Sequence, residues 1–157
     1  MPLQLNAKLF EDLAEYYGKI YHLSPLSSKV YACLAFDFTR KGISFEDLQQ
    51  KLGVSKSSVS QSLKILEDLH LITYTYKEHS RVRLFSLNSE YALCRFSKLI
   101  DNMQLEKELI ARMVAEKKKQ KTENEKLDAV FNLYTDTLTK NIALLEETMK
   151  TLQSIVT

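Results

Sequence analysis

The most constraining segment of this 157-residue chain runs from residue 43 to residue 72, with the sequence ISFEDLQQKLGVSKSSVSQSLKILEDLHLI. Ser44 can cap a helix, and Asp47, three residues later, completes an approximate capping box. Gly53 can adopt the left-handed conformation that ends a helix, and Ser55 can cap the next one. The segment therefore predicts two short helices joined by a tight turn, which is the form of a helix-turn-helix.

The second of these helices has an inward side and a polar side. Apolar residues recur at helical spacing and predict the inward side: Val59, Leu63, Leu66 and Leu69. The remaining positions predict the outward side: Lys56, Ser57, Ser58, Ser60, Gln61 and Lys64.

This outward side has the chemistry of a DNA-binding face. Serine hydroxyls, that of Ser55 included, and free N–H groups at a helix N-terminus can donate to phosphate. Gln61 can pair with an adenine edge, and Lys56 or Lys64 can reach guanine or phosphate. The face therefore predicts contact with double-stranded DNA. The alternative is that the serines only cap helices and the lysines are only solvated.

Two strand patterns follow the second helix. Residues 71–76 are rich in β-branched and aromatic side chains, and residues 82–87 alternate between apolar and polar. A hairpin that follows a recognition helix is a wing, and a cationic wing tip can enter a minor groove. The candidate contacts of the wing are Lys77, His79 and Arg81. The alternative is a surface hairpin that only covers the core, which Glu78 favours because it would oppose phosphate.

Three parts of the chain together resemble a known family. Residues 23–26, LSPL, open a helix; the helix-turn-helix segment follows; and RVRLFSL occupies residues 81–87. The order S-K-S-S-V-S-x-x-L-x-x-L-E, from Ser55 to Glu67, is the most specific part. Most of residues 23–91 thus resembles the MarR group of bacterial winged-helix repressors, and looks closest to its GbsR-type branch or to short MarR-like proteins.

The resemblance implies a homodimeric transcription regulator, most simply a repressor, that binds a palindromic operator. Carried over by position, the side chains that face bases and phosphates are Ser57, Ser58, Ser60, Gln61 and Lys64, and Arg81 is the wing arginine. The family wing often holds an Asp two residues before that arginine. His79 occupies this position here, so a wing contact could be weaker or pH-sensitive. The alternative, which is favoured, is a structural histidine at the hairpin tip without such a role.

The remaining segments predict a mainly α fold built around the winged helix-turn-helix of residues 23–89. Residues 1–22 are expected to form an N-terminal helix that contributes to dimerisation, running from about Leu5 to Tyr21. Ser24 and Pro25 can open the next helix, which is expected to reach about Arg40. Residues 90–157 are expected to form long dimerisation helices, at about residues 89–119 and 123–155.

The length of the C-terminal helices predicts a partner. A helix of about 30 residues is on the order of 45 Å long, which exceeds what a small winged-helix domain can cover. The excess apolar surface is expected to meet a second copy of the chain. Two copies related by a two-fold axis can place recognition helices in successive major grooves about 34 Å apart.

Composition limits the other classes of function. Apolar residues make up 45% of the chain, the net charge is +2, and no apolar run approaches the roughly 20 residues that span a bilayer. The chain is expected in the cytoplasm, away from membranes. It contains no glycine-rich phosphate loop, metal-ligand cluster or nucleophile elbow, so neither an enzyme nor a cofactor is expected. The near-neutral charge leaves open a winged-helix protein–protein interaction module without DNA binding.

A small-molecule effector is a further expectation. Aromatic residues gather in the first two helices: Tyr16, Tyr17, Tyr21 and Tyr31. Such a cluster can cage a cation, for example a quaternary ammonium. The alternative is that these tyrosines pack in the core with their hydroxyls directed to the surface.

Overall fold

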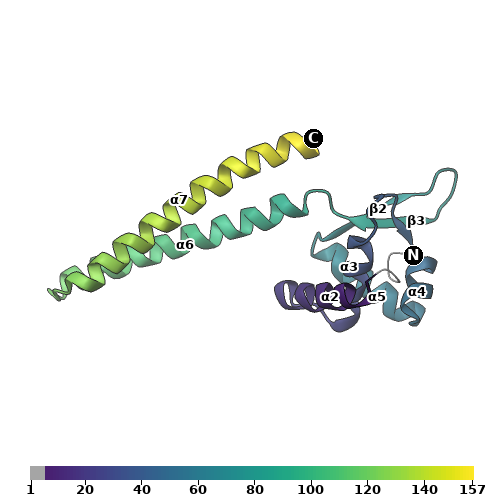
Figure 1. The fold of residues 1–157 in the computed structure, drawn as a ribbon, viewed down its shortest axis with the longest axis horizontal. Helices are drawn as coiled ribbons and strands as arrows, with labels where there is room; N and C mark the ends of the chain where they lie inside the picture. The colour runs from purple at the N-terminus through teal and green to yellow at the C-terminus, as the bar shows by residue number, and fades with distance from the viewer. Residues whose placement is uncertain (1–5) are drawn as a thin grey trace. The chain divides into compact units, whose positions relative to one another are not determined.

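The computed structural model describes residues 6–157, which form one compact unit that ends at Asn88 and a second unit, Ser89–Thr157 (Figure 1). The first unit consists of α2 (Ala7–Tyr21), α3 (Pro25–Ala35), β1 (Ile43–Ser44), α4 (Phe45–Leu52), α5 (Lys56–Asp68), β2 (Ile72–Tyr76) and β3 (Arg83–Leu87). The second unit consists of α6 (Tyr91–Lys119) and α7 (Glu125–Val156). Within residues 6–157, no helix has both the length and the apolar character that crossing a membrane requires.

The helix starts in the first unit follow the predicted capping residues. Ser24, Ser44 and Ser55 cap α3, α4 and α5, and each hydroxyl accepts a hydrogen bond from the backbone N–H three residues later. Gly53 ends α4 with φ 64°. The expected start of the first helix at Leu5 lies outside the described residues; in the structure Asn6 caps α2.

One helix is shorter than the sequence predicts. The expected extension of α3 to Arg40 is wrong, because the helix ends at Ala35 and a tight turn follows. The Asp37 carboxylate holds this turn by accepting hydrogen bonds from the Thr39 hydroxyl at 2.7 Å and the Gly42 N–H at 2.8 Å. Burial alone would raise the pKa of Asp37, but these hydrogen bonds together hold it below its usual value.

The core of the first unit lies between the helices and one face of the sheet. On α5 the buried side chains are Val59, Ser62, Leu63 and Leu66. The expectation that Leu69 continues this buried stripe is wrong, because Leu69 is 44% exposed. The helix ends at Asp68, and Leu69 follows as its cap, so the helical periodicity no longer directs this side chain inward.

The sheet contains the predicted hairpin and one additional strand. All pairings are antiparallel, in the order β1-β3-β2, with Tyr74 opposite Phe85 in the hairpin. The short strand β1, which the sequence reading did not anticipate, pairs Ile43 with Phe85 and Ser44 with Leu84. A mainly helical unit with a helix-turn-helix and a small antiparallel wing is a winged helix-turn-helix, as predicted.

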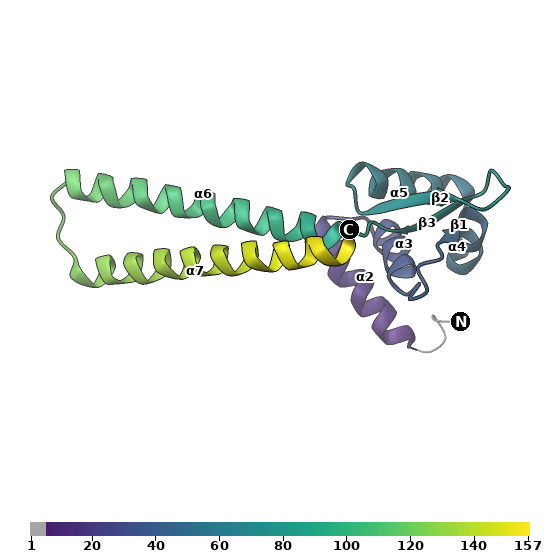
Figure 2. The same cartoon turned by 90° about the horizontal axis from the view of Figure 1, so that it is seen from above.

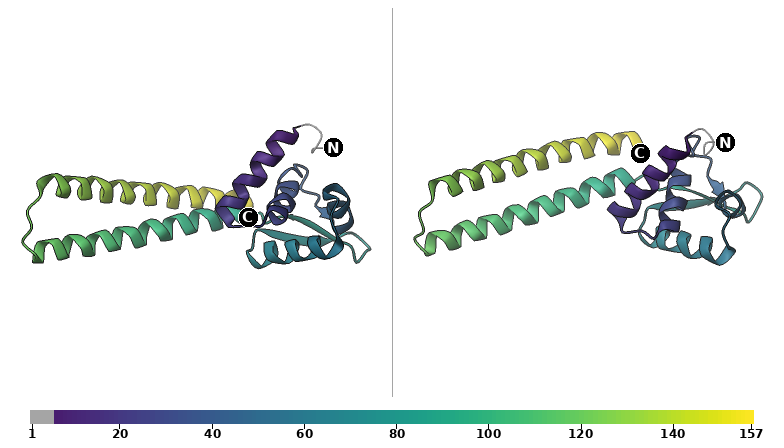
Figure 3. Two further views of the ribbon diagram at one scale, coloured as in Figure 1. Left: turned by 90° about the horizontal axis from the view of Figure 1, so that it is seen from below. Right: turned by 60° about the horizontal axis from the view of Figure 1, so that its bottom comes forward.

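The second unit is an antiparallel pair of long helices that run side by side (Figures 2 and 3). The connection at residues 120–124 includes Lys121 in the left-handed conformation, with φ 51°, and Asn124 as the cap of α7. Lys117 Nζ and Asp128 Oδ1 lie 2.7 Å apart and join the two helices next to this turn. Ile100 and Leu138 are buried between them.

Candidate nucleic-acid interface

α5 presents a continuous polar stripe to solvent. Ser57, Ser60, Gln61 and Lys64 are exposed, and their spacing of three, one and three residues places them along one side of the helix. The first turn contains Lys56 and no acidic residue. The partial positive charge of the helix N-terminus is therefore not neutralised locally, which favours a phosphate at this end.

The serines at the start of α5 form a small hydrogen-bonded group. The Ser55 oxygen lies 3.1 Å from the Ser57 oxygen and 2.7 Å from the Ser58 oxygen, and it accepts from the Ser58 N–H at 3.2 Å. Helix capping, the alternative role predicted for these serines, is thus one confirmed role of Ser55. Ser58 is half-buried, whereas Ser57 is exposed and turned toward solvent with the rest of the polar stripe.

A buried serine contact positions α5 against α3. The Ser27 hydroxyl donates to the Ser62 oxygen at 3.2 Å, and the Ser24 hydroxyl donates to Ser27 at 3.0 Å. Ser27 and Ser62 are almost completely buried, at 0% and 3% exposure. Small side chains allow the two helices to approach closely, and the hydrogen bond satisfies polar groups that would otherwise be costly to bury. Sequence reasoning missed this contact, because the two residues are 35 positions apart.

The wing tip carries exposed cationic candidates. Lys77 and Arg81 are exposed, and His79 is an exposed turn residue with φ 55° whose Nε2 lies 3.6 Å from Glu78 Oε1. The Lys77 N–H donates to the Val82 carbonyl at 2.8 Å, which closes the loop. Within residues 6–157, neither Lys77 nor Arg81 of the wing forms an ion pair, nor does Lys56 or Lys64 of α5.

Arg83 links the wing to α5, and the sequence did not predict this contact. Its guanidinium lies over the ring of Tyr74, 4.9 Å from the centroid, and 5.2 Å from the centroid of Phe85. Arg83 Nη1 also lies 4.0 Å from Glu67 Oε1 at the end of α5. Its charge is therefore partly balanced within the protein. The strand alternation of residues 82–87 was the available signal, because it places Arg83 on the same side as Phe85.

The tyrosines proposed as an effector cage pack largely against one another. Tyr31 is a core residue, 1% exposed. The ring of Tyr17 meets it edge-on at 4.6 Å, and that of Tyr21 does so at 5.7 Å. Tyr16 is 50% exposed, with its ring 5.6 Å from Tyr17. Core packing accounts for Tyr31, and a ligand site at this cluster stays a prediction.

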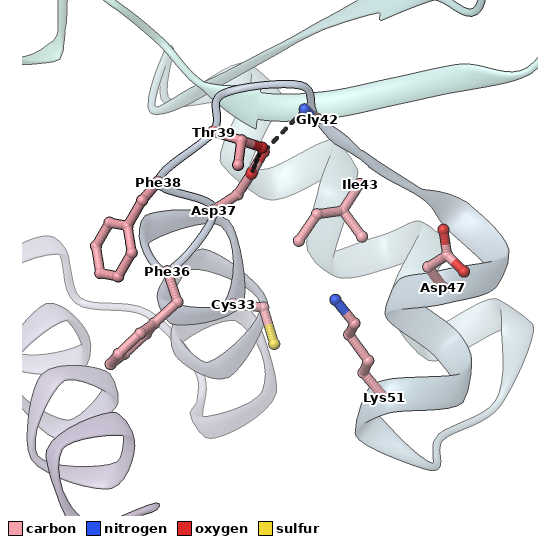
Figure 4. Close-up of a pocket in the computed structure, with 9 residues that line it drawn as sticks. All are labelled: Cys33, Phe36, Asp37, Phe38, Thr39, Gly42, Ile43, Asp47 and Lys51. Atoms are coloured by element: carbon pink, nitrogen blue, oxygen red, sulfur yellow. Dashed lines mark hydrogen bonds between the residues drawn. The ribbon is translucent and has the colours of Figure 1, made fainter. Parts of the chain in front are cut away.

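A pocket of about 290 Å³ lies elsewhere in the first unit, between the end of α3, the following turn and α4 (Figure 4). Its lining residues are Cys33, Phe36, Asp37, Phe38, Thr39, Gly42, Ile43, Asp47 and Lys51. Cys33 and Lys51 point into the same space. Burial raises the pKa of the Cys33 thiol to about 11, so the thiol stays protonated and is a poor nucleophile at neutral pH.

The fold and the exposed face of α5 define a winged helix-turn-helix protein. No protein-family model matches the chain, and no curated protein matches it. A solved structure described as the crystal structure of a transcriptional regulator aligns with 92% of this chain and 95% of its own, at a TM-score of 0.54 and 15% sequence identity. At that identity the likeness is one of fold.

Proposed function

We propose that this protein is a transcription regulator that binds double-stranded DNA through α5. In this proposal it acts as a repressor and binds a palindromic operator in the manner of MarR-like proteins. The observation that most supports this proposal is an exposed polar stripe on a helix whose first turn lacks acidic residues. The stripe consists of Ser57, Ser60, Gln61 and Lys64. Such a stripe combines donors for phosphate with side chains that read base edges. The solved structure of similar fold is itself described as a transcriptional regulator.

The wing supplies a second contact in this proposal. Lys77 and Arg81 extend from the hairpin that follows α5, and Arg83, at the loop end of that hairpin, contacts Tyr74 and Glu67. A guanidinium that enters a narrow minor groove gains from the enhanced negative potential there. Arg81 is the stronger candidate, because the charge of Arg83 is already shared with Glu67.

A homodimer completes the proposed mode of binding. One recognition helix reads only a few base pairs, whereas two copies can read two half-sites one helical turn apart. Sedimentation at micromolar concentration is expected to give twice the chain mass of 18.2 kDa. Selection of duplexes from a random pool is expected to return a two-fold symmetric consensus. A winged-helix protein–protein interaction module would return no consensus and show no salt-dependent affinity for DNA.

Removal of Lys64 is expected to weaken binding to every duplex by a similar factor. The side chain is exposed on α5, and a lysine bound to phosphate releases about one counterion. We therefore expect Lys64→Ala to lower the slope of log affinity against log salt concentration by about one. Fluorescence anisotropy with one duplex at several salt concentrations measures this slope.

A matched control is Lys19→Ala, which removes an equal charge from α2, where Lys19 is 73% exposed and pairs with Glu15. Its slope should stay at the wild-type value. Equal slopes for the Lys64→Ala variant and the wild type would show that α5 does not meet the phosphate backbone.

Loss of Gln61 is expected to change sequence preference more than overall affinity. A glutamine amide that is bidentate to adenine contributes about 1–3 kcal/mol of discrimination at one base pair. Gln61→Ala should therefore relax the selected consensus at one position in each half-site, while affinity for unrelated duplex is retained. Parallel selections with Gln153→Ala, an exposed glutamine of α7, control for the loss of an amide. An unaltered consensus for Gln61→Ala would exclude base reading by this residue.

A further inference from the structure

α7 carries a second heptad stripe beside the one that packs on α6. The stripe that faces α6 includes Phe131, Leu138, Ile142, Leu145, Met149 and Leu152. The second stripe alternates spacings of three and four residues and consists of Leu127, Val130, Tyr134, Thr137, Asn141, Leu144, Thr148, Thr151 and Ile155. It contains no charged residue and spans 28 residue steps, which is about 42 Å of helix.

Except for half-buried Thr148, the residues of the second stripe are exposed within the second unit. Val130 is 59% exposed, Leu144 is 62% exposed and Ile155 is 71% exposed, and Leu133, beside the stripe, is 71% exposed. Two adjacent apolar stripes on one helix are typical of a bundle helix that contacts two neighbours. Within the described residues of the second unit, α6 supplies one neighbour and covers the first stripe. Of the second stripe, Tyr134 also reaches α6, where its hydroxyl donates to Glu106 Oε1 at 2.8 Å.

The threonines of this stripe bond their hydroxyls to the backbone of their own helix. The Thr137 hydroxyl donates to the Leu133 carbonyl at 2.8 Å, and the Thr148 hydroxyl donates to the Leu144 carbonyl at 2.9 Å. Thr151 makes the same bond to Glu147 at 3.4 Å. Each hydroxyl already donates a hydrogen bond within the helix. Burying the side chain against a partner would therefore leave no donor unsatisfied. The stripe is therefore more apolar than its composition suggests.

The exposed apolar surface of this face supplies a substantial part of what a dimer contact needs. A large aliphatic side chain removes on the order of 100 Å² of apolar surface from water when it is buried. The large apolar side chains of this face are Leu127, Val130, Leu133, Tyr134, Leu144 and Ile155. Because these side chains are 37–71% exposed, together they offer roughly 350 Å² before the threonines are counted, which is somewhat under half of the about 800 Å² per partner in a standard interface.

The repeat itself indicates the partner. A stripe with spacings of three and four residues along a whole helix matches another helix with the same repeat, since knobs-into-holes packing needs equal periodicity. Asn141 is the central member, with four stripe residues on either side. A single asparagine at such a position fixes register in parallel two-stranded coiled coils, where the two amides can bond to each other.

We propose that α7 packs in parallel against α7 of a second copy through this stripe, with the two Asn141 side chains facing each other. The inference rests on the homodimer of the proposed function and specifies its contact. β3 ends at Leu87 and α6 begins at Tyr91, so each chain enters its helical hairpin just after the wing. A parallel pairing brings both entry points to the same end of the four-helix assembly, as one operator requires.

Cysteine cross-linking tests the parallel register. We expect Thr151→Cys, in a Cys94→Ser background, to form a disulfide-linked dimer on mild oxidation. In an antiparallel pairing centred on Asn141, the two residues 151 would be about 30 Å apart and could not link. Cys33 is buried and stays out of the reaction. Gln153→Cys, exposed on the far side of α7, is the matched control and should stay monomeric on a denaturing gel.

A charge placed in the stripe tests the contact itself. Leu144→Lys should raise the dissociation constant of the dimer by more than about tenfold, because it buries an unpaired ammonium. Ala143→Lys, one residue away and outside the stripe, should leave the constant unchanged, and circular dichroism should show equal helix content for both. A wild-type monomer would refute the dimer and this contact together. A wild-type dimer with no Thr151 cross-link, or one insensitive to Leu144→Lys, would refute only this contact.

Discussion

Replacement of Leu66 by alanine is expected to lower the free energy of unfolding of the first unit by about 2–5 kcal/mol. Leu66 is completely buried on the inner side of α5, where it packs in the core with Val59 and Leu63. Removal of its branched end leaves a cavity that the surrounding helices and sheet can fill only in part. Urea denaturation followed by circular dichroism measures the loss.

Leu69→Ala is the matched control for this prediction. The same atoms are removed three residues further along the chain, but Leu69 is 44% exposed, and we expect a loss below about 1 kcal/mol. Similar losses for the two variants would mean that the inner side of α5 is not the one assigned here. The polar side proposed to bind DNA would then also be misplaced.

Gly42→Ala is expected to destabilise the first unit by about 2–4 kcal/mol, by two separate effects. Gly42 has φ +84°, in the left-handed region, which costs about 1–2 kcal/mol for a residue with a Cβ. A Cβ at this position would also lie 2.9 Å from Leu84 Cβ and 3.2 Å from the Phe85 carbonyl oxygen. One of these atoms is a Cβ and the other is a backbone oxygen, and both are part of β3. The clash can therefore be relieved only if the strand moves.

Gly53→Ala separates the two effects. Gly53 also has a positive φ of 64°, but a Cβ there would meet no heavy atom within 4 Å. We expect only the conformational cost of about 1–2 kcal/mol. Thermal unfolding should therefore rank the wild type above Gly53→Ala, and Gly53→Ala above Gly42→Ala. Equal midpoints for the two variants would show that β1 does not approach β3 as closely as described.

This close approach matters for the wing. β1 continues directly into α4, and its pairing with β3 connects the first helix of the helix-turn-helix to the hairpin. Arg83 adds a second connection, from β3 to the end of α5 through Glu67. The wing is therefore connected to both helices of the helix-turn-helix. We expect the Gly42→Ala variant to lose DNA affinity along with stability.

The candidate site was largely predictable because its signals are local. The serine hydroxyl at Ser44 and at Ser55 accepts a hydrogen bond from the backbone N–H three residues later, which has no partner within the helix. This local contact defines a helix start without reference to the rest of the chain. Glycine at position 53 defines the helix end in the same way. Once those bounds are set, helical periodicity assigns Gln61 and Lys64 to the side opposite Leu63 and Leu66.

The parts that escaped prediction depend on residues far apart in the sequence. Strand β1 exists because two residues meet Leu84 and Phe85, some 40 positions later. Ser62 is buried because Ser27 approaches it from another helix, and Arg83 is held by Tyr74 and Glu67. Leu69 faces solvent because α5 ends one residue earlier. No local pattern specifies which distant atom will be a neighbour.

The amino-acid sequence by itself determined where most helices of this protein begin, where the two helices of the helix-turn-helix lie and which side of the second is polar. These properties follow from hydrogen bonds and periodicity within a few residues. Only the tertiary structure decided that Gly42 must lack a side chain, that Arg83 braces the wing, and that α7 retains an uncovered stripe after α6 has packed on it. Those properties depend on which surfaces remain free or come into contact once the chain has folded.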